Sequence, residues 1–125
     1  MASGTIHVEN DLLWTNAKPN TNFSPQTISL DLSGYSRVKI QFTPFGNTNQ
    51  VEFSECVVGS ASCLFYMQFS KDNTSSAGAF LNGVARNYSV TTTGVTFENG
   101  QMVYAGTAYT DWQNRSVPWK IFGIK

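Results

Sequence analysis

The segment 109–115 gathers side chains that suit the binding of a sugar. It reads Tyr-Thr-Asp-Trp-Gln-Asn-Arg and follows neither the two-residue period of a strand nor the 3.6-residue period of a helix, so we expect a loop. A tryptophan ring can stack on the C–H groups of a sugar, and planar carboxylate, amide and guanidinium groups can hydrogen-bond its hydroxyls. The sequence therefore predicts a glycan-binding site formed by Tyr109, Asp111, Trp112, Asn114 and Arg115.

Each polar group of this site has an expected role. Trp112 should stack on a sugar face, while Asp111 and Asn114 hold hydroxyl groups. Arg115 should hold either Asp111 or an anionic substituent such as a phosphate. The alternative is that Trp112 plugs one end of the core and that its polar neighbours are only solvated. A second candidate surface, of similar composition, is the segment 45–50.

The chain offers little for catalysis. His7 is the only histidine, and it falls in residues 1–10, where we expect a flexible or subunit-contacting N-terminal arm. Glu52 and Glu55 are three residues apart, so on a strand they would point to opposite faces and make a poor glycosidase pair. The sequence contains no phosphate-binding loop, dinucleotide fingerprint, nucleophile elbow or metalloprotease motif. We therefore expect no enzyme, no cofactor and no metal site.

The two cysteines, Cys56 and Cys63, flank Gly59-Ser60, a dipeptide that suits a two-residue hairpin turn. In such a hairpin the two cysteines would lie opposite each other, close enough for a disulfide. The alternative is two free thiols in the core, where reduced cysteine behaves as a small apolar side chain. The sequence leaves both alternatives open, but a pair without further cysteine or a nearby histidine is not a zinc site.

Alternation of apolar and polar residues predicts the elements that must position these groups. The clearest strands are 27–32 and 37–42, whose expected core residues are Ile28, Leu30, Val38, Ile40 and Phe42. Further strands are expected at 51–58, 63–69, 83–90, 95–98, 101–109 and 119–124, with a polar loop at 71–77. Arg86 interrupts the apolar series of its strand. Asn99-Gly100 predicts a type I′ hairpin turn between 95–98 and 101–109.

Composition agrees with this pattern. The 125 residues fit one domain, 41% of them are hydrophobic, and eight basic side chains balance eight acidic ones. Such a charge-poor chain lacks the basic stripe of a nucleic-acid binder and has no apolar run long enough to span a membrane. Short strands with regular turns and no helix predict an all-β fold, a single antiparallel β-sandwich or jelly-roll-like domain over residues 1–125.

Both ends of the chain carry a family resemblance. Leu12-Leu13-Trp14-Thr15-Asn16, Pro19 and the segment 23–35 resemble the opening of small β domains in tail proteins of phages and prophages of Gram-positive bacteria. The last segment, 117–125, is similar to the closing strand of those domains, whereas 36–108 has no counterpart. The resemblance implies a receptor-binding head at a tail tip or fibre, commonly a homotrimer. It covers scaffold residues, so it carries over no ligand site.

The expected function follows from this resemblance together with the predicted loop. We expect a virion structural protein that binds a host cell-surface polysaccharide and contacts other virion proteins. The alternatives are a structural virion module without a ligand, such as a decoration or baseplate protein, and, third, an enzyme that degrades a surface polymer. Residues 1–5 show no signal-peptide pattern, so the expected location is the virion, made in the host cytoplasm and released by lysis.

Overall fold

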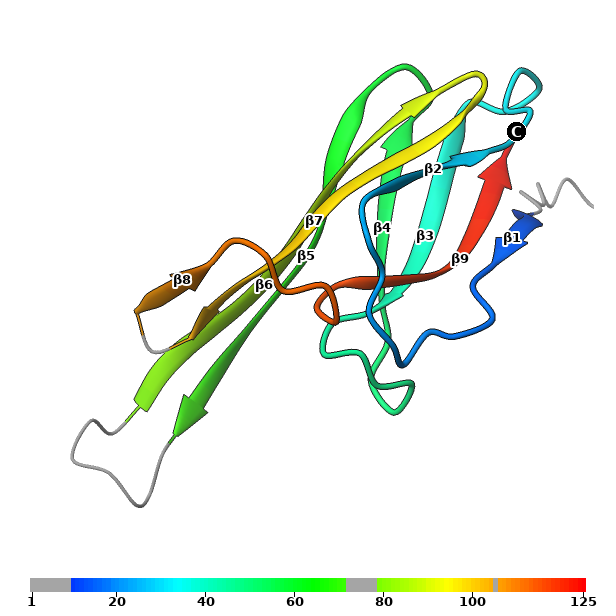
Figure 1. Cartoon of the computed structure of the whole chain (residues 1–125). Helices are drawn as coiled ribbons and strands as arrows, with labels where there is room; N and C mark the ends of the chain where they lie inside the picture. Colours follow the sequence, from blue (N-terminus) through cyan, green and yellow to red (C-terminus); the bar gives the residue numbers. More distant parts are fainter. Residues whose placement is uncertain (1–9, 72–78, 105) are drawn as a thin grey trace, which may run out of the picture.

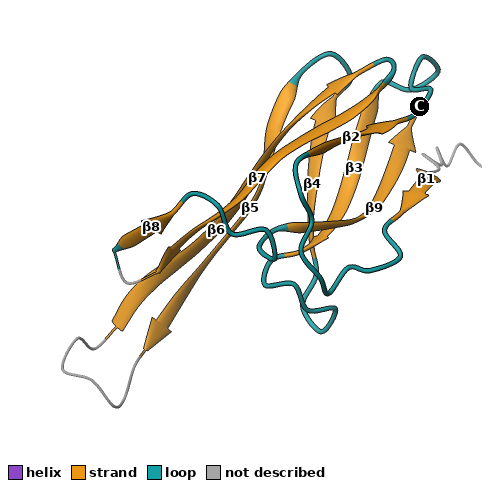
Figure 2. Ribbon diagram, viewed as in Figure 1, coloured by secondary structure: helices purple, strands orange, loops and turns teal. Residues whose placement is uncertain are grey.

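The computed structural model describes residues 10–71, 79–104 and 106–125, which are drawn in colour in Figure 1. The expected N-terminal arm, with His7, and most of the expected polar loop at 71–77 lie outside the described residues. The described part of the chain contains no helix that could span a membrane. It consists of strands and loops alone, as Figure 2 shows by colour.

The strands form two antiparallel sheets that pack face to face. The four-stranded sheet has the order β1-β9-β3-β4, with the bounds β1 (Asn10–Thr15), β9 (Val117–Ile124), β3 (Arg37–Thr43) and β4 (Glu52–Val57). The five-stranded sheet has the order β2-β7-β6-β5, with β8 paired to β7; the bounds are β2 (Gln26–Ser29), β7 (Gly94–Tyr104), β6 (Ala79–Thr91), β5 (Ala61–Lys71) and β8 (Thr107–Tyr109). The predicted all-β sandwich is therefore confirmed.

The core lies between the two sheets. Three of the expected core residues, Val38, Ile40 and Phe42 on β3, are completely buried. The other two, Ile28 and Leu30, are half-buried and pack against the edge of the core. Period-2 alternation places every second side chain of a strand on the same face, which is why the sequence pattern identified β3 correctly.

The five-stranded sheet is much longer than its partner along the strand direction. Strands β5, β6 and β7 have 11, 13 and 11 residues, whereas β3 and β4 have 7 and 6. As a result, one end of β5, β6 and β7 extends beyond the four-stranded sheet, and β8 lies along this extension (Figure 1). We call this part of the sheet the arm.

The hairpin turn that Gly59-Ser60 suits, on which the disulfide alternative depends, does not form. β4 and β5 belong to different sheets, and the chain crosses from one sheet to the other between them. At the crossing, Val58 N donates to Ser36 O, while Gly59 N donates to Val90 O in the opposite sheet. The glycine has a φ of 95°, in the left-handed region that favours this residue type. The dipeptide thus supplies a turn between layers rather than a turn within one sheet.

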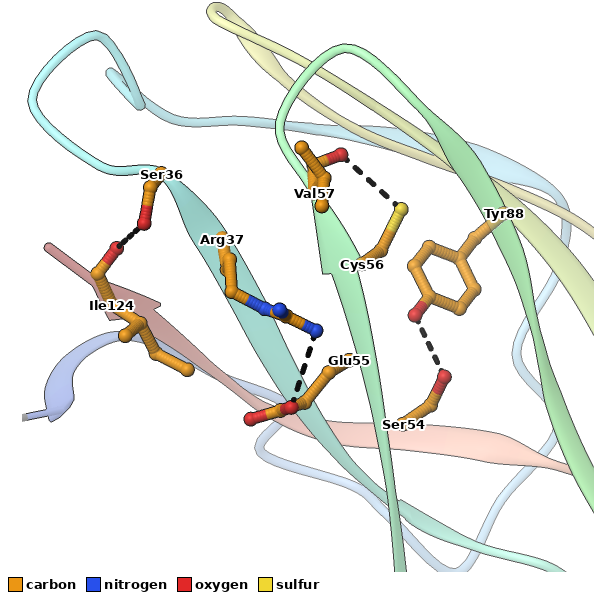
Figure 3. Close-up of polar contacts among 8 residues, drawn as sticks. All are labelled: Ser36, Arg37, Ser54, Glu55, Cys56, Val57, Tyr88 and Ile124. Carbon is orange, nitrogen blue, oxygen red and sulfur yellow. Dashed lines mark hydrogen bonds and ion pairs between the residues drawn. The ribbon is translucent and has the colours of Figure 1, made fainter.

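Both cysteines are free in this arrangement. Cys56 pairs with Val38 across β4 and β3 and is buried in the core, and its Sγ lies 3.4 Å from Val57 O (Figure 3). Cys63 pairs with Asn87 in the other sheet and is half-buried. Burial raises the pKa of both thiols, so both are protonated at neutral pH.

This environment predicts how the thiols react. At pH 8 we expect Cys56 to be alkylated much more slowly than Cys63, because it is more deeply buried and the thiolate is the reactive form. Denaturation in urea should make both react at the same fast rate. Mass spectrometry of maleimide-labelled protein over time measures both rates. A protein purified without reductant that takes up no label in urea would show instead that the two cysteines are oxidised.

The predicted hairpin at Asn99-Gly100 is wrong, because β7 continues through it. Pairing with β6 joins Arg86 to Gly100 and then Tyr88 to Phe97, so β7 carries two residues where β6 carries one. This is a β-bulge. The chain reverses later, where Tyr104 pairs with Thr107 of β8.

Candidate functional site

The predicted glycan segment lies between the arm and the last strand. Tyr109 is the final residue of β8, and residues 110–116 form the loop that leads into β9 (Figure 1). The loop is tied at both ends by backbone bonds: Trp112 N donates to Gly100 O at 2.8 Å, and Ser116 N donates to Pro44 O at 2.9 Å. The predicted loop is therefore confirmed, with Tyr109 just inside a strand.

The side chain of a buried arginine, Arg86, anchors this loop. Arg86 projects from β6 and is completely buried, with its guanidinium over the ring of Phe23 at 5.3 Å. Arginine has five N–H donors, and here five acceptors surround them. They are Ser116 O at 2.9 Å, Glu98 O at 2.7 Å, Gln113 O at 3.0 Å, Arg115 O at 3.1 Å and Gln113 Oε1 at 3.3 Å. Three backbone carbonyls of the loop therefore converge on one side chain.

The charge of Arg86 has no carboxylate partner within the described ranges, where the ion pairs are Arg37–Glu55 and Asp11–Lys125. Burial lowers the pKa of Arg86 to about 10, which leaves it charged at neutral pH. Carbonyl dipoles stabilise that charge in place of an anion. Sequence reasoning noted Arg86 only as an interruption of an apolar series. A charged residue on the inward side of a strand was the signal that could have identified it.

The side chain of Gln113 makes a second set of hydrogen bonds that hold the loop. Its Oε1 accepts from Gly100 N at 3.0 Å, and its Nε2 donates to Asn99 Oδ1 at 2.8 Å and to Asp111 Oδ1 at 2.5 Å. The expectation that Arg115 could hold Asp111 is thus not met, because Gln113 holds this carboxylate instead. Gln113 was not among the predicted site residues, yet it positions one of them.

Trp112 lies outside the core cluster and is half-buried. Its ring meets Tyr109 edge to face, with the centroids 5.0 Å apart. The guanidinium of Arg115 lies 5.4 Å from the Trp112 ring. Trp112 therefore does not plug the core, which was the alternative. It is Trp14 that packs against the core, edge on to Phe23.

The two candidate surfaces predicted from the sequence, residues 109–115 and 45–50, form one surface. Arg115 also lies 5.9 Å from the ring of Phe45, so its guanidinium bridges the 45–50 segment and the loop. Its Nη1 donates to Asn114 Oδ1 at 2.8 Å. A β-carbon added at Gly46 would come within 2.7 Å of Asn114 O, which shows how closely the segments approach. Sequence spacing could not reveal this neighbourhood, because 70 residues separate the two.

The loop borders a shallow hollow of about 370 Å³. Its walls are Asn22, Asp111, Trp112, Gln113 and Asn114. Three predicted residues therefore line the hollow, while Tyr109 and Arg115 hold the tryptophan ring. Asn22 was not predicted; the bond from Phe23 N to Gln113 O at 2.9 Å keeps its segment beside the loop. The mixture of an aromatic ring with amides and a carboxylate suits a polyhydroxylated ligand.

Comparisons with protein-family models, with curated proteins and with solved structures found no match for this chain. The resemblance of the two chain ends to phage tail domains therefore stays a hypothesis. Within residues 10–71, 79–104 and 106–125, no group of three or more His, Cys, Asp or Glu side chains could hold a metal ion.

Proposed function

We propose that this chain is a virion surface domain that binds a host cell-surface polysaccharide through the hollow beside Trp112. The observation that carries the proposal is a tryptophan ring outside the core, on a loop whose carbonyls are fixed by Arg86. A loop that is already ordered loses little conformational entropy on binding, which favours affinity for a small ligand. The virion setting rests on the resemblance of the chain ends.

The chemistry of binding follows from the lining groups. Trp112 stacks on the C–H face of one sugar ring, and the carboxylate of Asp111 accepts hydrogen bonds from its hydroxyls. The amides of Asn22 and Asn114 can both donate and accept. Arg115 does not line the hollow; its guanidinium bonds Asn114 Oδ1 and lies against the ring of Trp112, so in this proposal it holds the stacking ring in place.

The test is Trp112→Ala. A stacking tryptophan in a small site contributes about 1–3 kcal/mol, so the variant should bind roughly 5- to 150-fold more weakly. The free energy of unfolding should change little, because the ring lies outside the core. Titration calorimetry against a panel of purified Gram-positive cell-wall polysaccharides, some carrying phosphate, measures the affinity, and thermal melts measure the stability.

Trp119→Ala is the matched control. Trp119 is a half-buried tryptophan on β9, away from the hollow, so its removal should leave the affinity unchanged. Equal affinity of wild type and Trp112→Ala would contradict the proposed site. Failure of the wild-type protein to bind any polysaccharide of the panel would favour the alternative function, a structural virion module without a ligand.

The proposed function includes self-association as a homotrimer in contact with other virion proteins. The resemblance motivates the trimer. Large apolar side chains that stand exposed on the arm support the general idea of a partner, since such surfaces on soluble proteins are usually covered.

A further inference from the structure

The outer face of the arm is apolar. Phe65, Met67 and Phe69 alternate along β5, and their exposed fractions are 54%, 52% and 70%. Leu64, which directly precedes Phe65 and points to the opposite face, is completely buried, so the three point away from the sandwich interior. Directly paired residues of an antiparallel sheet share a face. The same face therefore carries Ala85, opposite Phe65, and the row Gly83, Val103 and Ala108, beside Met67.

A notch of about 280 Å³ lies in this face. Its lining combines small residues, Gly83, Ala85 and Ala108, with the larger Phe65, Met67 and Val103. No residue that lines the notch is charged. Phe69, the most exposed of the large apolar residues, stands two residues beyond Met67 on the same face, about 7 Å along the strand.

We infer that a second copy of this chain covers the arm face, with Phe69 of one copy in the notch of its neighbour. This inference rests on the proposed self-association and names the surface that forms it. A protruding aromatic ring and an uncharged notch lie on the same face, so two copies offer each other complementary shapes. Three copies form a closed trimer when the Phe69 side chain of each copy enters the notch of the next copy.

The exposed area supports a copy of the chain as the occupant. An aromatic side chain has about 200 Å² to bury, so Phe65, Met67, Phe69 and Val103 together leave roughly 400 Å² of apolar area uncovered. A stable interface buries about 800 Å² on each partner, so these four side chains supply around half of it. The outer face of the four-stranded sheet differs, because the charged side chains of Arg37, Lys39 and Glu55 separate its exposed apolar residues, Phe53 and Val57.

The first experiment places a charge on each face in turn. In analytical ultracentrifugation without glycan, wild type should have three times the 13.8 kDa mass of one chain at micromolar concentration. Phe65→Glu should sediment as a monomer. Phe53→Glu is the matched control, because Phe53 is 52% exposed on β4 and should leave the assembly intact. A Phe65→Glu variant that assembles like wild type would overturn the surface, and a monomeric wild type would overturn self-association itself.

The second experiment fills the notch without adding charge. A β-carbon at Gly83 meets no atom within 4 Å, so Gly83→Leu should fold normally as a monomer. If Phe69 enters the notch, this variant should associate about tenfold more weakly or worse. If copies associated only through non-specific apolar contact, the added leucine would strengthen association, and that result would contradict the inference. Glycan affinity is measured separately, so the proposed glycan site and the proposed arm interface can fail independently of each other.

Discussion

Replacement of Arg86 by methionine is expected to destabilise the domain by about 3–5 kcal/mol. Methionine fills similar space but removes the guanidinium donors of the Glu98, Gln113, Arg115 and Ser116 carbonyls, although Gln113 O keeps its bond from Phe23 N. Buried carbonyls without a donor are costly, and the loop beside the hollow would lose its anchor. Urea denaturation, followed by tryptophan fluorescence, should show a lower midpoint with an unchanged slope.

Arg37→Met is the matched control. Arg37 is 46% exposed, and its guanidinium lies 3.4 Å from Glu55 across the outer face of the four-stranded sheet (Figure 3). An exposed ion pair contributes at most about 1 kcal/mol, so this variant should unfold close to wild type. If Arg86→Met fails to fold, Arg86→Lys retains the charge and should recover part of the stability. Equal midpoints for Arg86→Met and Arg37→Met would show that the buried arginine is not the anchor.

Replacement of Gly100 by alanine should cost about 3 kcal/mol, at the upper end of the range for an overpacked site. Its β-carbon would overlap Trp112 O and lie 2.8 Å from Nη2 of Arg86 and 2.9 Å from Arg115 O. Two of these atoms belong to backbone that is itself tied down, so the neighbours cannot move apart cheaply. Chemical denaturation measures the loss. Because the loop would shift, glycan affinity should fall together with stability, unlike in Trp112→Ala.

Gly83→Ala is the control for this glycine. Gly83 lies in the same sheet, with nothing within 4 Å of an added β-carbon. Alanine in a strand interior is favoured over glycine by roughly 0.5–1 kcal/mol, so this variant should be as stable as wild type or slightly more stable. A Gly100→Ala variant with the same stability as Gly83→Ala would mean that the close approach at the bulge is not required.

Two hairpin turns that glycines suggest in the sequence are absent for the same physical reason. Asn99-Gly100 predicts a hairpin turn and Gly59-Ser60 suits one, because a glycine after or before a small polar residue is typical of such turns. Gly59 does have a positive φ, but its neighbours bond to different sheets. Gly100 is required for space rather than for a positive φ, because the Trp112 carbonyl and the Arg86 guanidinium approach it. A local pattern states that glycine is needed, and only the tertiary contacts decide why.

The all-β class, the inward residues of β3 and the loop that contains Trp112 could be predicted from the sequence. These depend on short-range regularities: alternation every two residues, and the absence of any periodicity over residues 109–115. The tertiary structure alone decided which strands share a sheet, that Arg86 rather than Arg115 organises the loop, and that the segments around Phe45 and Trp112 meet. Pairing between distant strands depends on the packing of two whole faces, and no short window of sequence contains that information.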